Sequence, residues 1–298
     1  MKPTDMDRQT LRPLIELLRE RSVVALTGAG LSAGSGLPTY RGPDGQWLHT
    51  KPILHDEFVR SATVRRRYWA RSLVGWPTIG HAAPNAGHLA LAALECRGAV
   101  SAVITQNVDG LHQKAGSDAV IELHGSIARV RCLSCRAVHR RMDVQAWLLA
   151  SNPHFAGPPP RPVASAPDGD ARLDDAEYEG FQVPDCPACG GVLKPDVVFY
   201  GDGVPRERVA AAMEALERAD GLLVVGSSLM VYSGYRFADR AHRLGKPVIA
   251  INRGLTRADA LLSAKLDLDC AAALDAAAGA LTTRVPSTAA RSPGRPAP

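Results

Sequence analysis

The chain has 298 residues, of which 46% are hydrophobic and 22% are charged, so it can bury one large core or two modest ones and is not a wholly disordered protein. Its net charge of +5 is a small excess, compatible with anionic ligands but not by itself indicative of nucleic-acid binding. No apolar run approaches the ~18 residues of a membrane span, so we do not expect this chain to be an integral membrane protein.

Short apolar strands alternate with helices along most of the chain, which is typical of βαβ units and predicts an α/β fold with a Rossmann-like parallel sheet. Most of the strands end in small or polar residues, and ligands bind outside the carboxyl ends of strands in such sheets. In chain order we predict a helix at 11–20, a strand at 22–26, a helix at 86–94, strands at 100–104 and 120–123, a helix at 206–219, and strands at 222–225 and 247–251.

Four of the six cysteines form two Cys-x-x-Cys pairs, at Cys132/Cys135 and Cys186/Cys189. Four thiolates complete a tetrahedral zinc shell and leave no position for water or substrate, so we expect a structural metal. The 50 residues between the pairs exceed the spacing that is usual in zinc sites. The Pro- and Gly-rich composition of 152–169 predicts an irregular loop, which accounts for the extra length. A redox role for the pairs is the alternative.

Two segments interrupt the alternation of strands and helices, and we expect them to form a second, smaller domain as insertions. The first has no clear strand, and the second contains both cysteine pairs. The end of the chain is rich in Pro and Ser and should be disordered. The predicted division is a Rossmann-like domain of 1–36, 80–128 and 195–281, a small helical and zinc-binding domain of 37–79 and 129–194, and a tail at 282–298.

The N-terminus contains Asp5 and Asp7 and no apolar stretch. This pattern predicts neither a secretory signal nor a mitochondrial presequence, which should be poor in acidic residues. The expected location is the reducing cytoplasm, where paired cysteines favour zinc over disulfides.

Polar and glycine-rich segments follow three of the predicted strands. Gly28-Ala29-Gly30 can bring backbone N–H groups close to a pyrophosphate, although a plain glycine turn is the alternative. Gln106, Asn107 and Asp109 can grip the ribose or amide of a ligand, or cap the next helix. His124 follows the strand at 120–123, where it can act as an acid or base near neutral pH, or be structural.

Together these motifs resemble the sirtuin family. The resemblance covers about residues 14–275 in the family's order. It rests on 28–41 (GAGLSAGSGLPTYR), 105–112 (TQNVDGLH), His124-Gly125, the four cysteines and 226–228 (GSS). Three further stretches are most similar to class II sirtuins, the branch that contains the mitochondrial lipoamidase type: 67–71 (RYWAR), 194–202 (KPDVVFYGD) and 231–236 (VYSGYR).

The resemblance implies an NAD-dependent protein-lysine deacylase, a deacetylase by default, with NAD+ as co-substrate and one structural Zn2+. The acyl group of an acyl-lysine protein or peptide would pass to ADP-ribose, with release of nicotinamide. His124 would be the general base, Asn107 and Asp109 would orient the ribose and nicotinamide, and a substrate peptide would add as a strand along Val197, Val198 and Phe199. The implied cofactor residues are Gly28, Ala29, Gly30, Ser32, Thr39, Tyr40, Arg41, Gln106, Asn107, Asp109, Gly226, Ser227, Ser228, Asn252, Arg253 and Cys270.

Two features bear on rate and specificity. Thr39 stands where many family members have Asp, so closure of the cofactor loop or nicotinamide exchange can differ. Tyr68 and Arg71 share a helix face if this segment is helical, and a Tyr and an Arg at this spacing bind acidic acyl groups in the desuccinylase branch. The alternative is that Arg71 belongs to a solvated basic face.

Two other functions remain open. Mono-ADP-ribosyl transfer would use the same NAD site with a different nucleophile. A zinc-ribbon nucleic-acid binder would use arginines around the first cysteine pair, but would leave the glycine loop, Gln106–Asp109 and His124 unexplained. These arginines are Arg129, Arg131, Arg136, Arg140 and Arg141.

Overall fold

The computed structural model describes residues 8–46, 48, 53–155 and 178–282. Its main element is a six-stranded sheet in the order β3-β2-β1-β7-β8-β9, in which every neighbouring pair is parallel. β1, β7 and β8 are buried along their whole length, which explains why their sequences are apolar except for Thr27 at the end of β1. The strands are β1 (Val23–Thr27), β2 (Val100–Thr105), β3 (Val120–Glu122), β7 (Gly221–Val225), β8 (Val248–Ile251) and β9 (Ala264–Leu266).

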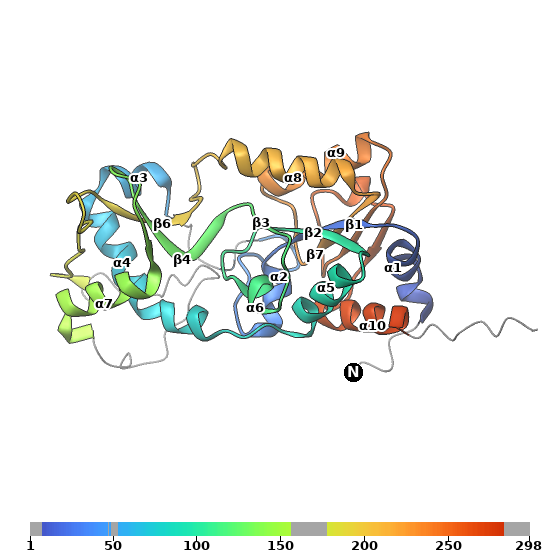
Figure 1. Cartoon of the computed structure of the whole chain (residues 1–298), viewed down its shortest axis with the longest axis horizontal. Helices are drawn as coiled ribbons and strands as arrows, with labels where there is room; N and C mark the ends of the chain where they lie inside the picture. Colours follow the sequence, from blue (N-terminus) through green and yellow to red (C-terminus); the bar gives the residue numbers. More distant parts are fainter. Residues whose placement is uncertain (1–7, 47, 49–52, 156–177, 283–298) are drawn as a thin grey trace, which may run out of the picture.

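Helices cover both faces of this sheet (Figure 1). Successive side chains of β1 alternate between the faces: Val23 and Ala25 belong to the core beneath α1, α5 and α10, whereas Val24 and Leu26 belong to the core beneath α8 and α9. The helices around the sheet are α1 (Arg8–Glu20), α2 (Ala29–Ser32), α5 (Ala86–Cys96), α6 (Leu111–Lys114), α8 (Arg206–Arg218), α9 (Tyr232–Arg243) and α10 (Cys270–Thr282).

A second, antiparallel sheet in the order β5-β4-β6 lies at the other end of the molecule (Figure 1). It shares a separate core with the neighbouring helices, built on Phe58, Trp69 and Val144. Arg141 is fully buried and donates to the backbone oxygen of Ser72 at 3.0 Å, which ties α7 to α4. The elements are α3 (His55–Arg60), α4 (Ala62–His81), β4 (Gly125–Cys132), β5 (Val138–Arg140), α7 (Arg141–Ser151) and β6 (Leu193–Val197).

The predicted α/β fold, a Rossmann-like parallel sheet with a smaller cysteine-containing unit formed by insertions, is confirmed. The limits 128/129 and 194/195 fall inside β4 and β6, because these two strands pair with each other and run from one unit toward the other. Of the irregular loop at 152–169, all beyond 155 lies outside the described residues, as does the tail after Thr282, which ends α10. None of the described helices combines the length and apolar character needed to cross a bilayer.

Candidate active site

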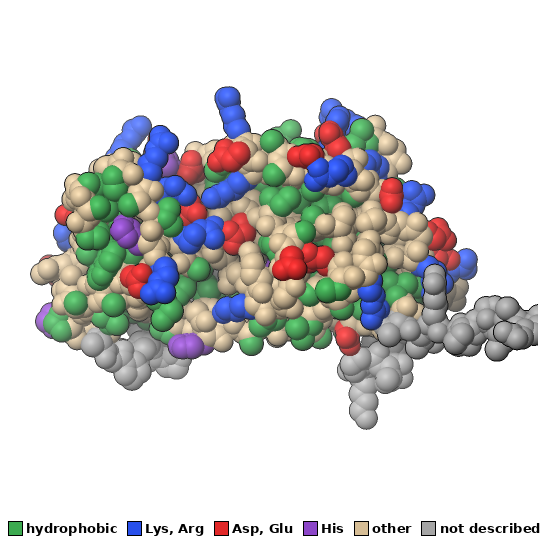
Figure 2. Space-filling model, viewed as in Figure 1, with side chains coloured by type: hydrophobic (Ala, Val, Ile, Leu, Met, Phe, Trp, Pro, Cys, Tyr) green, Lys and Arg blue, Asp and Glu red, His purple; other side chains and the backbone are tan. Residues whose placement is uncertain are grey.

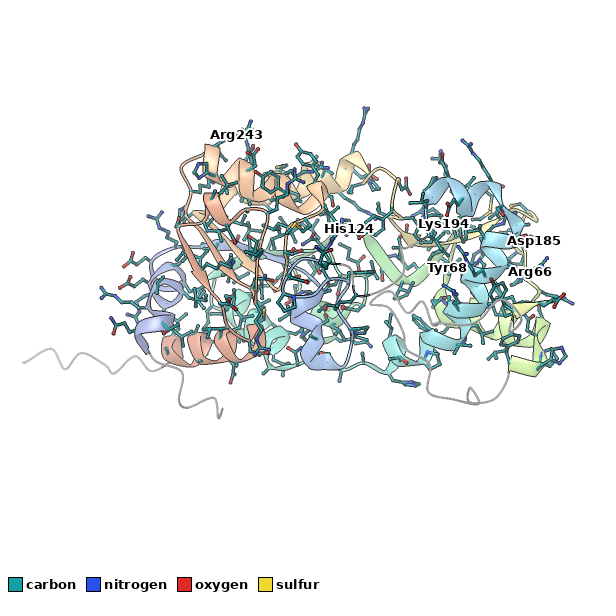
Figure 3. The ribbon with its side chains drawn as sticks, turned by 180° about the vertical axis from the view of Figure 1, so that it is seen from behind. Arg66, Tyr68, His124, Asp185, Lys194 and Arg243 are labelled. Atoms are coloured by element: carbon teal, nitrogen blue, oxygen red, sulfur yellow. The ribbon has the colours of Figure 1, made fainter. Side chains whose placement is uncertain are left out.

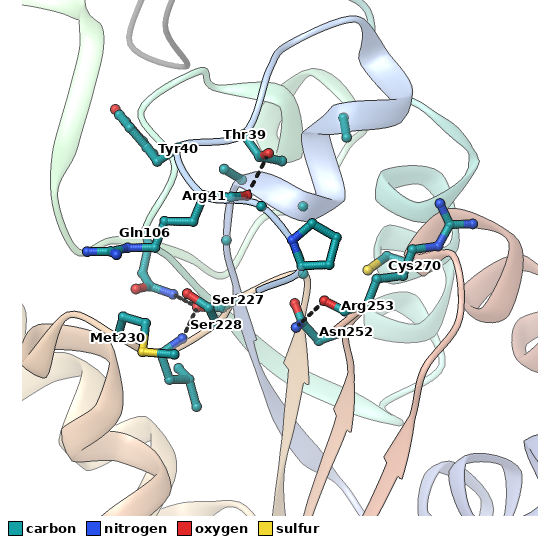
Figure 4. Close-up of a pocket in the computed structure, with 18 of the residues that line it drawn as sticks. Thr39, Tyr40, Arg41, Gln106, Ser227, Ser228, Met230, Asn252, Arg253 and Cys270 are labelled. Atoms are coloured by element: carbon teal, nitrogen blue, oxygen red, sulfur yellow. Dashed lines mark hydrogen bonds between the residues drawn. The ribbon is translucent and has the colours of Figure 1, made fainter. Parts of the chain in front are cut away.

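A cavity of about 300 Å³ opens at the carboxyl ends of β1, β7 and β8 (Figure 4). The residues that follow these strands, Gly28, Gly226 and Asn252, are part of its wall. The strand order reverses at β1, since the chain moves outward through β2 and β3 and then returns to β7 on the other side. The cavity therefore lies at the topological switch point, where open α/β sheets bind their ligands.

The floor of this cavity is made of closely packed glycine backbone. Gly28 N donates to Val225 O at 3.0 Å, and Gly30 N donates to Gly226 O at 2.9 Å. A Cβ at Gly28 would lie 2.7 Å from Gly226 O, and Gly226 itself has a φ of 60°. Side chains are excluded here by both space and backbone conformation. A floor of bare backbone suits the close approach of a pyrophosphate, so the cavity fits the dinucleotide that the motifs imply.

Polar side chains form the walls around the glycine floor (Figure 4). Gln106 Nε2 donates to Ser227 Oγ at 2.7 Å, and Asn252 Nδ2 donates to Arg253 O at 2.9 Å. These bonds hold hydroxyl and amide groups at the cavity surface. The predicted cofactor residues that line this cavity are Gly28, Ala29, Gly30, Thr39, Tyr40, Arg41, Gln106, Gly226, Ser227, Ser228, Asn252, Arg253 and Cys270.

A smaller cavity of about 30 Å³ adjoins the first and shares Ala29, Tyr40 and Gln106 with it. The remaining predicted cofactor residues line this cavity and are bonded to one another. Asn107 Nδ2 donates to Ser32 Oγ at 3.0 Å, and Ser32 Oγ donates to Asp109 Oδ2 at 2.7 Å.

Asp109 in this smaller cavity is only 9% exposed, and its other carboxylate oxygen accepts from Leu111 N at 2.9 Å. A carboxylate held in this way, in a place nearly free of water, can stabilise positive charge that develops on a bound group.

His124 contacts the backbone of Gln106, which lines both cavities, but is not itself among the residues that line them. Its Nδ1 is 3.0 Å from Gln106 O, and because a carbonyl only accepts, Nδ1 must carry the proton. Nε2 is then the free base, 2.9 Å from Ser233 Oγ. Burial lowers the pKa of His124, the bond to Gln106 opposes this, and the charges of Arg208 and Arg236 lower it further. The ring is thus neutral at physiological pH and able to accept a proton.

The four paired cysteines meet in one cluster between β4 and the segment before β6. All four are free thiols whose Sγ atoms lie within 4.8 Å of one another. Cys132 Sγ is 3.5 Å from Cys189 Sγ, and Cys135 Sγ is 3.8 Å from Cys186 Sγ. Four sulfurs bound at ~2.3 Å around a tetrahedral zinc lie ~3.8 Å apart, so the cluster fits the predicted Zn2+.

Of the predicted substrate residues, Figure 3 labels Tyr68, which lies on α4 within the small unit, to the right of His124 in that view. Val198 N donates to His124 O at 2.8 Å, although only Val197 of the predicted strip belongs to β6. Phe199 is buried, and its ring centroid lies 5.4 Å from that of Tyr68. Arg71 lies on α4, the helix that also contains Tyr68, and is partly exposed.

Sequence reasoning did not identify Ser233, nor the apolar part of the main cavity wall. This part includes Met230, Val231, Leu255 and Leu268. The position just after the Gly-Ser-Ser motif was a usable signal for Met230 and Val231. Ser233 lies in the stretch 231–236 that resembles class II sirtuins, but no local signal predicts its contact with His124, which spans 109 residues of sequence.

A parallel sheet of this strand order with a glycine floor at its switch point defines a dinucleotide-binding protein of the Rossmann class. Comparison with known proteins narrows this class. The model of the Sir2 family matches residues 28–233, and the chain belongs to this family.

Relatives and solved structures agree with the family assignment. The chain is 53% identical over 268 residues to an NAD-dependent protein deacetylase of Xanthomonas axonopodis pv. citri, covering 90% of each. It is 47% identical to NAD-dependent protein deacetylase 2 of Bradyrhizobium diazoefficiens, covering 92% of this chain and 98% of the relative. A solved structure described as "Sir2-p53 peptide-NAD+" superposes with a TM-score of 0.70 at 31% identity, covering 89% of this chain and 95% of that one. Another, "Sir2 bound to acetylated peptide", has a TM-score of 0.69 at 29% identity, covering 89% and 94%.

Proposed function

We propose that the protein is an NAD-dependent protein-lysine deacylase, a deacetylase by default, which transfers the acyl group to ADP-ribose with release of nicotinamide. The observation that carries this is that the two cavities adjoin, with Ala29, Tyr40 and Gln106 in the wall of both. One end offers a backbone floor for a pyrophosphate, and the other offers Asn107 and Asp109. Relatives carry the name of deacetylase, and a similar structure holds both a peptide and NAD+.

Each group of site residues has a role in this proposal. The glycine floor would hold the pyrophosphate, and Asn252, Arg253 and the backbone at Cys270 would line the adenosine end. Asn107 and Asp109 would orient the nicotinamide ribose. When bound, NAD+ supplies an N-glycosidic bond whose cleavage develops positive charge, and the buried Asp109 carboxylate would stabilise that charge. His124 would take the proton of a ribose hydroxyl at Nε2.

The cysteine cluster would serve structure and not catalysis. Cys132 is the last residue of β4 and Cys135 follows it, whereas Cys186 and Cys189 precede β6. One Zn2+ would therefore link these two segments of the small unit. Four thiolates fill its tetrahedral shell and leave no open position for a reactant.

The substrate peptide would bind along Val197 and Val198, which are only partly buried. Val198 N already donates to His124 O, so the peptide would pair through the remaining backbone groups of this strip. The lysine-borne acyl chain would then pass the aromatic group of Tyr68 and Phe199.

Acyl preference would depend on Tyr68 and Arg71, with carboxylated acyl chains favoured. The test compares glutaryl-type and acetyl peptides on Arg71→Met, with Arg66→Met on the same helix as the control. We expect Arg71→Met to lower the ratio of glutaryl to acetyl activity roughly tenfold, because it removes one charge-assisted hydrogen bond to the acyl carboxylate. An unchanged ratio would refute this role.

Three finer assignments complete the proposal. The stretches 67–71, 194–202 and 231–236 favour the class II branch of the family. Two clusters of apolar residues, one against each face of the parallel sheet, and a third around Trp69 and Cys132 support the division into a Rossmann-like and a small domain. The four free thiols favour a reducing cytoplasmic location.

The experiment that tests the function follows nicotinamide and peptide together. The protein is incubated with NAD+ and an acetyl-lysine peptide, and both products are quantified by chromatography. We expect one nicotinamide for each deacetylated lysine. Nicotinamide release with an unchanged peptide, and with ADP-ribose attached to protein, would instead indicate mono-ADP-ribosyl transfer.

A further inference from the structure

The first turn of α9 contacts both Gln106 and His124. Ser233, the second residue of α9, is only 8% exposed, and its Oγ lies 2.9 Å from His124 Nε2. A Cβ at the next residue, Gly234, would lie 2.4 Å from Gln106 Oε1, so the helix packs directly on the Gln106 side chain. Gln106 O in turn accepts from His124 Nδ1. The imidazole is therefore held at both of its nitrogens.

These two hydrogen bonds determine which nitrogen of the His124 ring carries the proton. Because Nδ1–H donates to Gln106 O, Nε2 carries no proton and has a lone pair, so the Ser233 hydroxyl must donate to it. After Nε2 has gained a proton, the same hydroxyl can rotate and accept from it, since a serine hydroxyl is both donor and acceptor. Ser233 is thus a partner for Nε2 in both protonation states.

The charges that face His124 make such a partner important. Arg208 of α8 and Arg236 of α9 both disfavour the imidazolium. Arg208 lies 3.4 Å from Asp196 of β6, a carboxylate that also contacts Arg129 and Arg131 of β4. Arg129 also pairs with Glu122 of β3, so this group holds four arginines and two carboxylates. The arginines are in excess, and the positive ring depends on its hydrogen bonds to Gln106 and Ser233.

We propose that Ser233 is a positioning residue for His124. In the free protein its hydroxyl donates to the single in-plane lone pair of Nε2 and so holds the ring in place. A ribose hydroxyl must displace this hydrogen bond before it gives its proton to Nε2, and the Ser233 hydroxyl then accepts from Nε2–H of the imidazolium. In that step the O–H bond breaks, the N–H bond forms, and the electron pair stays on the ribose oxygen. This inference rests on the proposed role of His124 as the base.

The first test needs no turnover. The pKa of His124 is measured by NMR titration of histidine side chains in the free protein, with His124→Ala to assign the signal. Hydrogen bonds to charged groups are stronger than those to neutral ones, so we expect Ser233→Ala to lower the pKa of His124 by roughly one unit. Ser233→Thr keeps the hydroxyl and should titrate like the wild type.

The matched control is Ser101→Ala, which removes a hydroxyl of β2 that donates to Val23 O of β1. Both residues lie at the amino ends of their strands, whereas His124 follows the carboxyl end of β3. It should leave the His124 titration unchanged. Should Ser233→Ala fail to fold, Ser233→Cys takes its place, because a thiol is a weak partner of similar size. A wild-type titration curve in a folded variant that lacks the hydroxyl would overturn the inference.

The second test is the pH profile of kcat/KM for deacetylation. We expect Ser233→Ala to lower kcat/KM roughly tenfold at neutral pH, and to move the acid limb to lower pH, with Ser233→Thr restoring both. The two tests separate the failures. A shifted titration in a protein that deacetylates nothing would refute the proposed function, whereas activity that needs His124 with an unmoved titration would refute the role of Ser233.

Discussion

Replacing Gly226 by Ala tests the glycine floor of the cofactor cavity most sharply. Gly226 has a φ of 60°, and a Cβ there would lie 2.3 Å from Leu31 N and 2.6 Å from Gly30 C. These neighbours are backbone atoms of α2, the short helix that follows β1, so neither can rotate away. The new methyl group must push the turn after β7 and α2 apart.

The expected loss of stability has two parts. A left-handed conformation costs a non-glycine residue about 1–2 kcal/mol, and overpacking of a tight contact costs about 1–3 kcal/mol more. Gly226→Ala should therefore lower the free energy of unfolding by about 2–5 kcal/mol. Because the displaced backbone is the surface that would meet the pyrophosphate, NAD+ affinity should fall by at least tenfold.

Gly98→Ala is the matched control. Gly98 has a φ of 74°, but its Cβ would meet nothing within 4 Å. It carries only the conformational cost of about 1–2 kcal/mol, with wild-type affinity for NAD+. Urea unfolding followed by circular dichroism and titration calorimetry with NAD+ give the two quantities. Equal losses of stability in the two variants, together with unchanged NAD+ binding by Gly226→Ala, would refute the close-packed floor.

Two further predictions concern acid stability and the cysteine cluster. Burial and the nearby His88 lower the pKa of His112 to about 3, so the unfolded chain binds protons more readily than the folded one below pH ~6.5. The free energy of unfolding should therefore fall as the pH decreases below ~6.5. In urea unfolding, His112→Asn should reduce the dependence of this free energy on pH by roughly 1 kcal/mol per pH unit between pH 6 and 4. An unchanged pH dependence would contradict this. Elemental analysis should find one zinc per chain, and chelation or Cys186→Ser should lower the melting temperature and activity together, whereas Cys96→Ser, an exposed residue outside the cluster, should change neither. Loss of zinc without loss of fold or activity would exclude the structural role.

The central sheet could be predicted because its strands are buried on both faces. β1, β7 and β8 are apolar runs, apart from Thr27 at the end of β1. By contrast, β9 has only three residues, and the middle one is Lys265. The buried residues of α9 are small except for Phe237. Such elements are stabilised by tertiary packing and leave little periodicity in the sequence.

The same distinction applies to the site. Glycines and polar residues directly after strands could be placed together from the sequence, because parallel strands bring their carboxyl ends to one edge. The four cysteines were recognisable because each Cys-x-x-Cys pair has a local spacing that is typical of zinc ligands. Ser233 was not, since its relation to His124 depends on how α9 packs against Gln106.

The most direct measurement of the central claim is mass spectrometry of the acyl product. The wild-type protein and His124→Ala are incubated with NAD+ and a panel of acyl-lysine peptides. The account predicts O-acyl-ADP-ribose and deacylated peptide from the wild type, with a loss of about 10²–10⁴-fold in the variant. Deacylated peptide with free carboxylate and intact NAD+, or full activity in His124→Ala, would contradict it.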